Sequence, residues 1–308
     1  MPQPRAIIDL GTNTFQLLIA DQDPSNGGMK ILYEDHRPVG LGKGAMETGL
    51  LQLDAMARAL EALERFLWHA QDKNCVSIQG IGTSILRNAR NASGFIELVE
   101  SQLGIPIKVI SGIQEADYIF QGIRHSLPEP WDAVSLVMDI GGGSVEFILF
   151  QGQTILFKTS LELGGLKLQS LFQKESEYHV DLDKELEAYI QSGLQSLYEA
   201  CELHQPQRLI GAAGAFETLA DIQLAQGHLM HIEKANQLDL PAFYALMDQI
   251  AKLTVAERQA IPGMKAFRAS MLPYANHLIA QVMAKTSIKE LWMSMFSLKE
   301  GYWYSTQE

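Results

Sequence analysis

The sequence predicts an α/β fold made of two similar halves, each a βββαβα-type domain. Two observations lead to this prediction. The first is a repeated segment, because AIIDLGTNTFQLLIAD from Ala6 and VMDIGGGSVEFILF from Val137 both place Asp-x-Gly between two apolar runs. The second is the order of elements, since three strands followed by alternating helices and strands are predicted from each starting point. We expect a ligand to lie in a cleft between the two halves.

The first half begins with strands predicted over residues 6–10, 15–20 and 29–36. A helix follows from Leu53, because apolar residues then recur at helical spacing with charged residues on the opposite side. The pattern continues with a strand over 76–81, helices over 84–89 and 95–103, a strand over 107–110 and a helix over 113–125.

The segment SLPEPWD, residues 126–132, has two prolines and no apolar periodicity, so we place the domain boundary there. The expected domains are residues 1–128 and 129–308, with the last helix, about residues 297–308, packing back on the first domain. The second half repeats the order of the first, with strands over 134–140, 145–150, 154–159 and 208–211 and around Leu291, and helices around Leu166, over 182–201, after Gly214, near Pro241 and Arg268, and from Leu298.

Length and composition favour a two-domain globular protein of the cytoplasm. The chain has 308 residues, of which 47% are hydrophobic, enough for two cores. It has no apolar run of membrane-spanning length, and its start, MPQPRAIIDL, does not have the regions of a signal peptide. Cys75 and Cys201, the only cysteines, fit neither a disulfide framework nor a metal motif. The net charge of -12 argues against nucleic-acid and membrane partners, so an anion must be held locally by glycine amides, arginines or a metal.

The two Asp-x-Gly turns are candidate phosphate-binding sites. A glycine after a strand lets backbone N–H groups approach an anion closely, and hydroxyl side chains add donors to the same turn. One turn of this kind is more simply an ordinary tight turn, whereas two copies at equivalent points of two halves favour phosphate binding. The candidate phosphate-binding residues are Gly11, Thr12, Asn13, Thr14, Gly141, Gly142, Gly143 and Ser144.

Two further segments carry groups that can act on a phosphate. In GTSILRNARN, Arg87 and Arg90 lie three residues apart near a helix start, and they either grip a phosphate or are solvated arginines of a capped helix. In SGIQEADYIFQGI, the spacing of Ser111 and Gln114 predicts a capping box. Glu115 then lies in the first turn, where local sequence favours a complement to the helix dipole over a general base.

Two carboxylates accompany the second turn. Asp139 ends one predicted strand, and Glu146 lies in its hairpin partner. Carboxylates near phosphate more often hold Mg²⁺ than contact the anion, although Glu146 can equally be an exposed strand residue. A third turn, IGAAGAFETL, follows the strand over 208–211 and is expected to face the far end of the ligand.

In this order, these segments resemble the exopolyphosphatase / guanosine pentaphosphate phosphohydrolase (Ppx/GppA phosphatase) family, in its short two-domain form. The segments that carry the resemblance are IDLGTNTFQLLIA, GTSILRNARN, VISGIQEADYIFQGI, VMDIGGGSVEFIL, LELGGLKL and LKEG. The resemblance implies an actin-like ATPase (ribonuclease H-like) duplication and a Mg²⁺-dependent attack of water on a terminal phosphoryl group. It implies that Glu115 is the catalytic base and Arg87 a catalytic phosphate ligand. Asp139 and Glu146 would position the metal and the water.

The chain departs from the family pattern at several positions. Gln114 and Asp117 stand where the family usually has glutamate and arginine, and Lys299 replaces an arginine near the end. The third turn carries alanines and Phe216 where the family usually has small hydroxyl residues. We therefore expect the ring of Phe216 to narrow the space for a nucleoside, which makes inorganic polyphosphate a better substrate than pppGpp.

The sequence thus predicts a phosphoanhydride hydrolase that acts on polyphosphate, pppGpp or both, with Mg²⁺ as cofactor. Two other classes stay open: a kinase of the same superfold, and a non-catalytic protein that binds polyphosphate or an alarmone. A kinase needs a well-formed pocket for adenosine. Asp117 stands where the family usually has an arginine, and the loss of this positive charge suggests a non-catalytic binding protein. The candidates for the positive lining of a polyanion site are Arg87, Arg90, Lys167, Arg268 and Lys299. A homodimer is compatible with the sequence.

Overall fold

The computed structural model describes residues 3–128, 131–173 and 184–307. The chain forms two compact units: unit 1 comprises Met1–Gly122 and Leu298–Glu308, and unit 2 comprises Ile123–Ser297. Residues 129–130, beside the predicted domain boundary, lie outside the described residues. None of the helices formed by the described residues combines the length and apolar character that a membrane span requires.

Unit 1 is built on a five-stranded mixed sheet in the order β3-β2-β1-β4-β5. Strands β1, β2 and β3 are antiparallel neighbours, whereas β4 runs parallel to β1 and β5 parallel to β4. The strands are β1 (Arg5–Leu10), β2 (Thr14–Gln22), β3 (Met29–Pro38), β4 (Ser77–Gly82) and β5 (Ile107–Val109). The helices are α1 (Ala45–Thr48), α2 (Leu53–Asp72), α3 (Ser84–Asn88), α4 (Ala92–Leu103), α5 (Gly112–Ser126, of which residues 123–126 belong to unit 2) and α13 (Leu298–Ser305).

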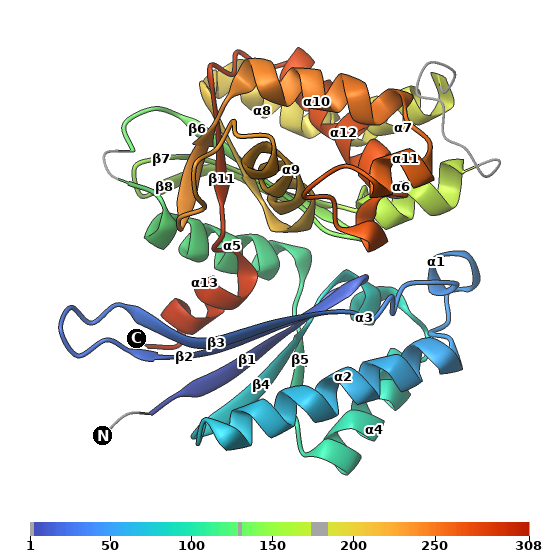
Figure 1. The fold of residues 1–308 in the computed structure, drawn as a ribbon, viewed down its shortest axis with the longest axis vertical. Coiled ribbons are helices and arrows are strands. Elements are labelled where there is room, and N and C mark those ends of the chain that lie inside the picture. The colour runs from blue at the N-terminus through green and yellow to red at the C-terminus, as the bar shows by residue number, and fades with distance from the viewer. Residues whose placement is uncertain (1–2, 129–130, 174–183, 308) are drawn as a thin grey trace. The chain divides into compact units, whose positions relative to one another are not determined.

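A continuous run of apolar side chains along β1 gives this sheet two covered faces. Ala6, Ile8 and Leu10 belong to a core cluster that also contains the buried side chains of α2 and α4. Ile7 is equally buried but points to the opposite face. On that side α13 packs against β1 and β2, while α2 and α4 cover the first face (Figure 1). The C-terminal helix is thus part of unit 1.

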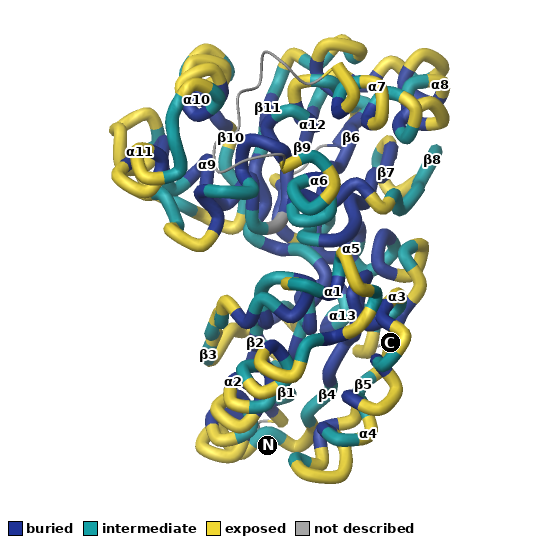
Figure 2. The backbone as a smooth tube through the Cα atoms, turned by 90° about the vertical axis from the view of Figure 1, so that its right-hand side faces the viewer, coloured by how far each residue is buried: buried dark blue, intermediate teal, exposed yellow. Residues whose placement is uncertain are grey.

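Unit 2 is built on a six-stranded mixed sheet in the order β10-β11-β9-β6-β7-β8. Its central strands are buried along their length (Figure 2). The strands are β6 (Ser135–Ile140), β7 (Val145–Gln151), β8 (Thr154–Leu161), β9 (Arg208–Ala212), β10 (Ala235–Leu238) and β11 (Glu290–Ser294). The helices are α6 (Gly165–Phe172), α7 (Lys184–Gly193), α8 (Gln195–His204), α9 (Ala213–Ala225), α10 (Leu240–Lys252), α11 (Val255–Gln259) and α12 (Leu272–Ala284).

The predicted α/β duplication is confirmed by the two sheets. In each unit the first strand pairs antiparallel with the second and parallel with the fourth, as β1 does with β2 and β4, and β6 with β7 and β9. The helix predicted over 182–201 begins outside the described residues, and its described part is divided at Leu194 into α7 and α8. Strand β10 was not predicted, because Ala-Asn-Gln-Leu is short and has no apolar alternation.

Candidate functional site

The first candidate turn connects β1 to β2, and a segment that follows β3 closes on it. The backbone N–H of Gly40 donates to the carbonyl of Asn13, and that of Gly42 donates to the carbonyl of Thr12, both at 2.8 Å. A Cβ atom on Gly42 would collide with the Thr12 methyl group. Thr12 itself is buried. Glycine at position 42 therefore allows a close contact that fixes the turn.

The second turn is held in the same way by the segment that follows β8. The N–H of Gly164 donates to the carbonyl of Gly143 at 3.1 Å, and the N–H of Gly165 donates to the carbonyl of Gly141 at 3.0 Å. The amides of Leu166 and Lys167 both donate to the carbonyl of Gly142, each at 3.0 Å. A Cβ atom on Gly164 would lie 2.5 Å from the backbone of Gly142 and Gly143. The first residues of α6 thus bind the carbonyl groups of the second turn.

The carbonyl groups of both turns are engaged, whereas several of their amides are not. Within residues 3–128, 131–173 and 184–307, no protein acceptor receives a hydrogen bond from the N–H of Thr12, Gly142 or Gly143. Consecutive unpaired N–H groups in a glycine turn form a concave site for an anion. The structure therefore brings the predicted phosphate-binding residues of each unit into one turn, in which the N–H groups of Thr12, Gly142 and Gly143 remain available.

The catalytic pair predicted in unit 1 is in direct contact. The guanidinium Nη1 of Arg87, from α3, lies 2.6 Å from Oε2 of Glu115, from α5, and also donates to the carbonyl of Ile110 at 3.1 Å. Glu115 is buried. The predicted capping box is confirmed, because the Ser111 N–H donates to Oε1 of Gln114 at 2.9 Å and the Gln114 N–H donates to the Ser111 hydroxyl at 3.2 Å.

The two arginines of the GTSILRNARN segment have different environments. Nη2 of Arg87 is buried and has no hydrogen-bond partner among the described residues, so it can bind an anion while Nη1 holds Glu115. Arg90 instead donates through Nη2 to the carbonyl of Thr48 at 2.8 Å, and its own N–H donates to the carbonyl of Gly49 at 3.0 Å. Arg90 therefore anchors the segment around α1.

The two carboxylates of unit 2 lie opposite each other on neighbouring strands. Asp139 of β6 faces Glu146 of β7 in the antiparallel register, which places both side chains on one face of the sheet. Both are buried. The hydroxyl of Ser297 donates to Asp139, and that of Ser160 donates to Oε1 of Glu146 at 2.7 Å. Neither serine was predicted to belong to the site, because neither lies in a motif.

This arrangement fits a Mg²⁺ site that is completed by a ligand. No group of three or more potential metal-binding side chains is present in the described parts of the chain. Mg²⁺, however, is commonly held by one or two carboxylates together with phosphate oxygens and water. Two buried carboxylates on one face repel each other unless a cation or a proton compensates their charge. Asp139 and Glu146 are therefore a suitable donor pair.

The interpretation of Phe216 in the third turn is wrong. Its side chain is fully buried, lies against Gly211 and stacks on Phe243 with the ring centroids 6.5 Å apart. The ring belongs to the core of unit 2, so it does not narrow the space for a nucleoside. The side chain that lies over this turn is Arg268, which donates to the carbonyl of Gly214.

We expect Phe216→Thr to destabilise the protein instead of admitting a nucleoside. Replacing a fully buried ring in this way leaves a cavity and buries a hydroxyl group, at a cost of about 3 kcal/mol or more. The matched change Phe267→Thr, at an exposed ring of the same unit, is expected to cost about 0.5 kcal/mol or less. Denaturant unfolding of both variants provides the measurement. A Phe216→Thr protein as stable as the wild type, with an altered substrate ratio, would restore the original interpretation.

Two cations considered for a polyanion site are engaged in ion pairs. Arg268 binds Glu217 at 3.4 Å and is buried, which lowers the pKa of its guanidinium although the Glu217 carboxylate acts in the opposite direction. Lys299 lies 2.5 Å from Oε1 of Glu300 and 3.5 Å from Oε1 of Glu34. Both side chains are therefore engaged within their own units.

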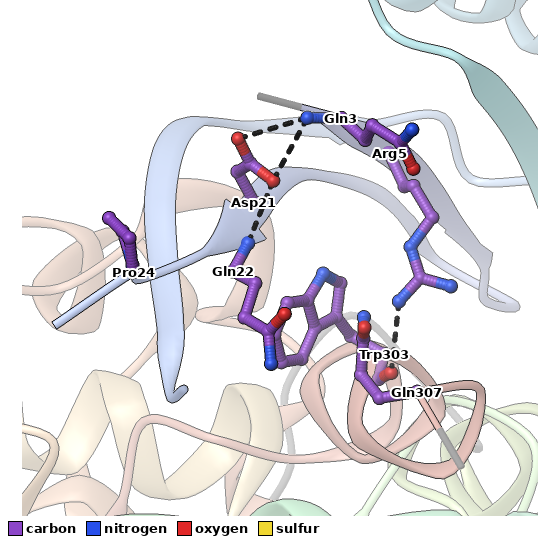
Figure 3. A pocket seen from close by; sticks show the side chains of 7 residues that line it. All are labelled: Gln3, Arg5, Asp21, Gln22, Pro24, Trp303 and Gln307. Carbon is purple, nitrogen blue, oxygen red and sulfur yellow. Dashed lines mark hydrogen bonds between the residues drawn. The ribbon is translucent and has the colours of Figure 1, made fainter. Parts of the chain in front are cut away.

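A polar cavity of about 500 Å³ lies elsewhere in unit 1 (Figure 3). One wall contains Asp21, whose carboxylate accepts hydrogen bonds from the N–H groups of Gln3 and Gln22. Another contains Arg5, which donates to the carbonyl of Trp303 at 3.4 Å. The described residues that line the cavity are Gln3, Arg5, Asp21, Gln22, Pro24, Trp303 and Gln307, and they include no predicted site residue.

Comparison with known proteins agrees with the resemblance noted in the sequence. The family model for the Ppx/GppA phosphatase family matches residues 18–308. The chain belongs to the Ppx/GppA phosphatase family. An exopolyphosphatase from Cytophaga hutchinsonii, known from its crystal structure, is 36% identical with a TM-score of 0.93, covering 99% of this chain and 97% of that one.

Two further relatives extend the comparison. A guanosine-5'-triphosphate,3'-diphosphate pyrophosphatase of Vibrio parahaemolyticus is 30% identical over 302 residues, which are 97% of this chain but 58% of the relative. The chain therefore spans less than two thirds of that curated Ppx/GppA relative. The Aquifex aeolicus family member is 23% identical with a TM-score of 0.79, covering 100% of this chain and 98% of that one, and shows the same fold.

Proposed function

We propose that the protein hydrolyses phosphoanhydride bonds and releases the terminal phosphate of inorganic polyphosphate or pppGpp. The observation that carries this proposal is the partly buried pair of Arg87 and Glu115, in which Nη2 of Arg87 is left for an anion. The names of the Cytophaga exopolyphosphatase and the Vibrio pyrophosphatase support the same reaction class. Both polyphosphate and pppGpp present a terminal phosphoryl group to such a pair.

In this proposal Glu115 is the general base. Its carboxylate takes a proton from a water molecule, and the water oxygen attacks the terminal phosphorus while the bond to the bridging oxygen breaks. The leaving phosphate chain keeps the bridging oxygen and its negative charge. Arg87 stabilises the ionised carboxylate through Nη1 and binds a phosphate oxygen through Nη2. The amides of the glycine turns provide further hydrogen bonds to phosphate oxygens.

Asp139 and Glu146 would hold a Mg²⁺ ion in this mechanism. When bound, the ion neutralises negative charge on the phosphate oxygens. The hydroxyl groups of Ser297 and Ser160 orient the two carboxylates by donating to them. These hydrogen bonds fix the direction of the two carboxylate groups.

The change Asp139→Asn is expected to raise the Mg²⁺ concentration needed for half-maximal rate by about tenfold or more. It removes one negative charge from the pair and keeps the shape of the side chain. The measurement is a Mg²⁺ titration of phosphate release. Asp248→Asn, on the exposed side of α10, is the matched control and should titrate like the wild type. If the Mg²⁺ titration of Asp139→Asn is unchanged, Asp139 does not help to bind Mg²⁺ and has a structural role in the second turn instead.

The proposed function is tested by incubating the purified protein with Mg²⁺ and one of three substrates, which are long-chain polyphosphate, pppGpp, or ATP with a mixture of sugars. We expect phosphate release from polyphosphate or pppGpp. Phosphorylated sugar without phosphate release would identify a kinase. Tight binding of polyphosphate without turnover would identify a non-catalytic binder. Either of these last results contradicts the proposal.

A further inference from the structure

We propose that Lys43 and Lys167 bind phosphate groups of the substrate beyond the terminal one. This inference rests on the proposed function, because it concerns how the same substrate is held. It also gives a role to a second repeated motif in the chain, which contacts each of the two glycine turns.

The second repeat is a Leu-Gly pair that follows the third strand of each unit. Leu41-Gly42 comes after β3 and Leu163-Gly164 comes after β8, and both leucines are buried. In each pair the glycine N–H donates to a carbonyl of the turn, at 2.8 Å for Gly42 and 3.1 Å for Gly164. Both glycines leave no space for a Cβ atom. The two units therefore use the same contact to close a segment on their turns.

Each of these segments carries a lysine next to the turn. Lys43 directly follows Gly42, and its side chain is exposed. Lys167 lies in the first turn of α6, and its own N–H donates to the carbonyl of Gly142 at 3.0 Å. A lysine carries its charge on a flexible four-carbon stem. Both ammonium groups can therefore reach phosphates that lie next to a phosphate bound at the turn.

These two lysines differ from three of the other cations considered for a polyanion site. Arg87, Arg268 and Lys299 each form an ion pair with a carboxylate of their own unit. Within the described parts of the chain, neither Lys43 nor Lys167 forms an ion pair. In a protein of net charge -12, unpaired cations beside anion-binding turns are the groups that a polyanion would contact.

The segment that carries Lys43 is held at both ends. Gly40 and Gly42 fix its start on the first turn, as described above. At its end, Arg90 binds the carbonyl of Thr48, and the Asn91 side chain exchanges two hydrogen bonds with the backbone of Leu51, at 2.8 and 3.0 Å. Because hydrogen bonds already order this backbone, binding an anion at Lys43 costs less conformational entropy than binding at a segment that must first become ordered.

We expect Lys43→Gln and Lys167→Gln each to raise KM for long-chain polyphosphate about threefold to tenfold and to leave kcat within about twofold. The phosphates beyond the terminal one contribute to binding and do not react, so their loss affects KM. Since salt screens contacts between solvent-accessible charges, KM of the variants should also rise less steeply with salt than KM of the wild type.

The test measures kcat and KM at several salt concentrations, and the dissociation constant of long-chain polyphosphate in a Glu115→Gln background by calorimetry. The matched controls are Lys30→Gln in unit 1 and Lys285→Gln in unit 2, which remove the same charge from exposed positions. Unchanged KM and affinity in both lysine variants, or equal changes in the controls, would overturn the inference. If wild-type protein turns over polyphosphate normally in that case, the proposed function stands. If wild-type protein releases no phosphate from any substrate, both fail.

Discussion

Replacing Glu115 with glutamine should lower turnover by about 10²-fold or more while polyphosphate binding persists. Glutamine preserves the volume of the side chain and the capped start of α5, but its amide cannot accept the proton of the attacking water. It can still accept a hydrogen bond from Arg87 through its side-chain oxygen, so the Nη2 group stays in place. The loss should therefore appear in kcat and not in the dissociation constant of the substrate.

The matched control is Glu64→Gln, on the exposed side of α2 in the same unit. It removes the same charge, so a general effect of net charge on polyanion binding would appear in both variants. Phosphate release and calorimetric binding are compared for the two proteins and the wild type. Wild-type turnover in Glu115→Gln would show that Glu115 only complements the helix dipole.

The second large effect is expected at Gly164, where alanine should reduce turnover by about 10²-fold. The backbone of Gly164 has φ -62 and ψ 155, which alanine adopts without strain, so the effect must come from space alone. An added Cβ atom would lie 2.5 Å from the backbone of Gly142 and Gly143, and α6 or the turn must move. A displacement of about 1 Å in a group that positions a substrate can cost about 10²-fold in rate.

Gly94→Ala is the control for this variant. A Cβ atom at Gly94, in α4, meets no other atom within 4 Å, so its turnover and stability should match or exceed those of the wild type. Turnover is corrected for the folded fraction from thermal unfolding, which separates displacement of the turn from loss of fold. A Gly164→Ala protein with wild-type turnover would show that the second turn tolerates movement and does not position a phosphate.

The fold was predictable because the two halves share one local pattern. Buried runs such as Ile7-Ile8 end in the same Asp-x-Gly turn as Val137-Met138, and this repetition fixes the duplication without any long-range information. The short strand β10 was not predictable in this way, because its pairing with β11 depends on tertiary contacts. The capping box of α5 is purely local, and its prediction is confirmed by the hydrogen bonds of Ser111 and Gln114.

The surroundings of a candidate site residue were predictable from the sequence only where the residue's own segment determines them. The pairing of Arg87 with Glu115 brings two segments together and was not predicted, because the resemblance assigned the two residues separate roles. The orientation of Phe216 could not be read from its neighbours, since a helix residue after a glycine turn can point to a ligand or to the core. Gly211 has no side chain, and the ring of Phe216 occupies the space that a Cβ atom would take there. This space determines that the ring points to the core. The roles assigned to the turn residues, Asp139 and Glu146 stay predictions until variants are measured.

The most direct test of the central claim is the source of the oxygen in the released phosphate. Polyphosphate is incubated with the protein and Mg²⁺ in water enriched in oxygen-18, and the released orthophosphate is analysed by mass spectrometry. Attack by a water that Glu115 activates predicts that each released phosphate carries a single solvent oxygen, at a rate that falls with Glu115→Gln. Phosphate without solvent oxygen, or a phosphoryl group recovered on another acceptor, would contradict hydrolysis at this site.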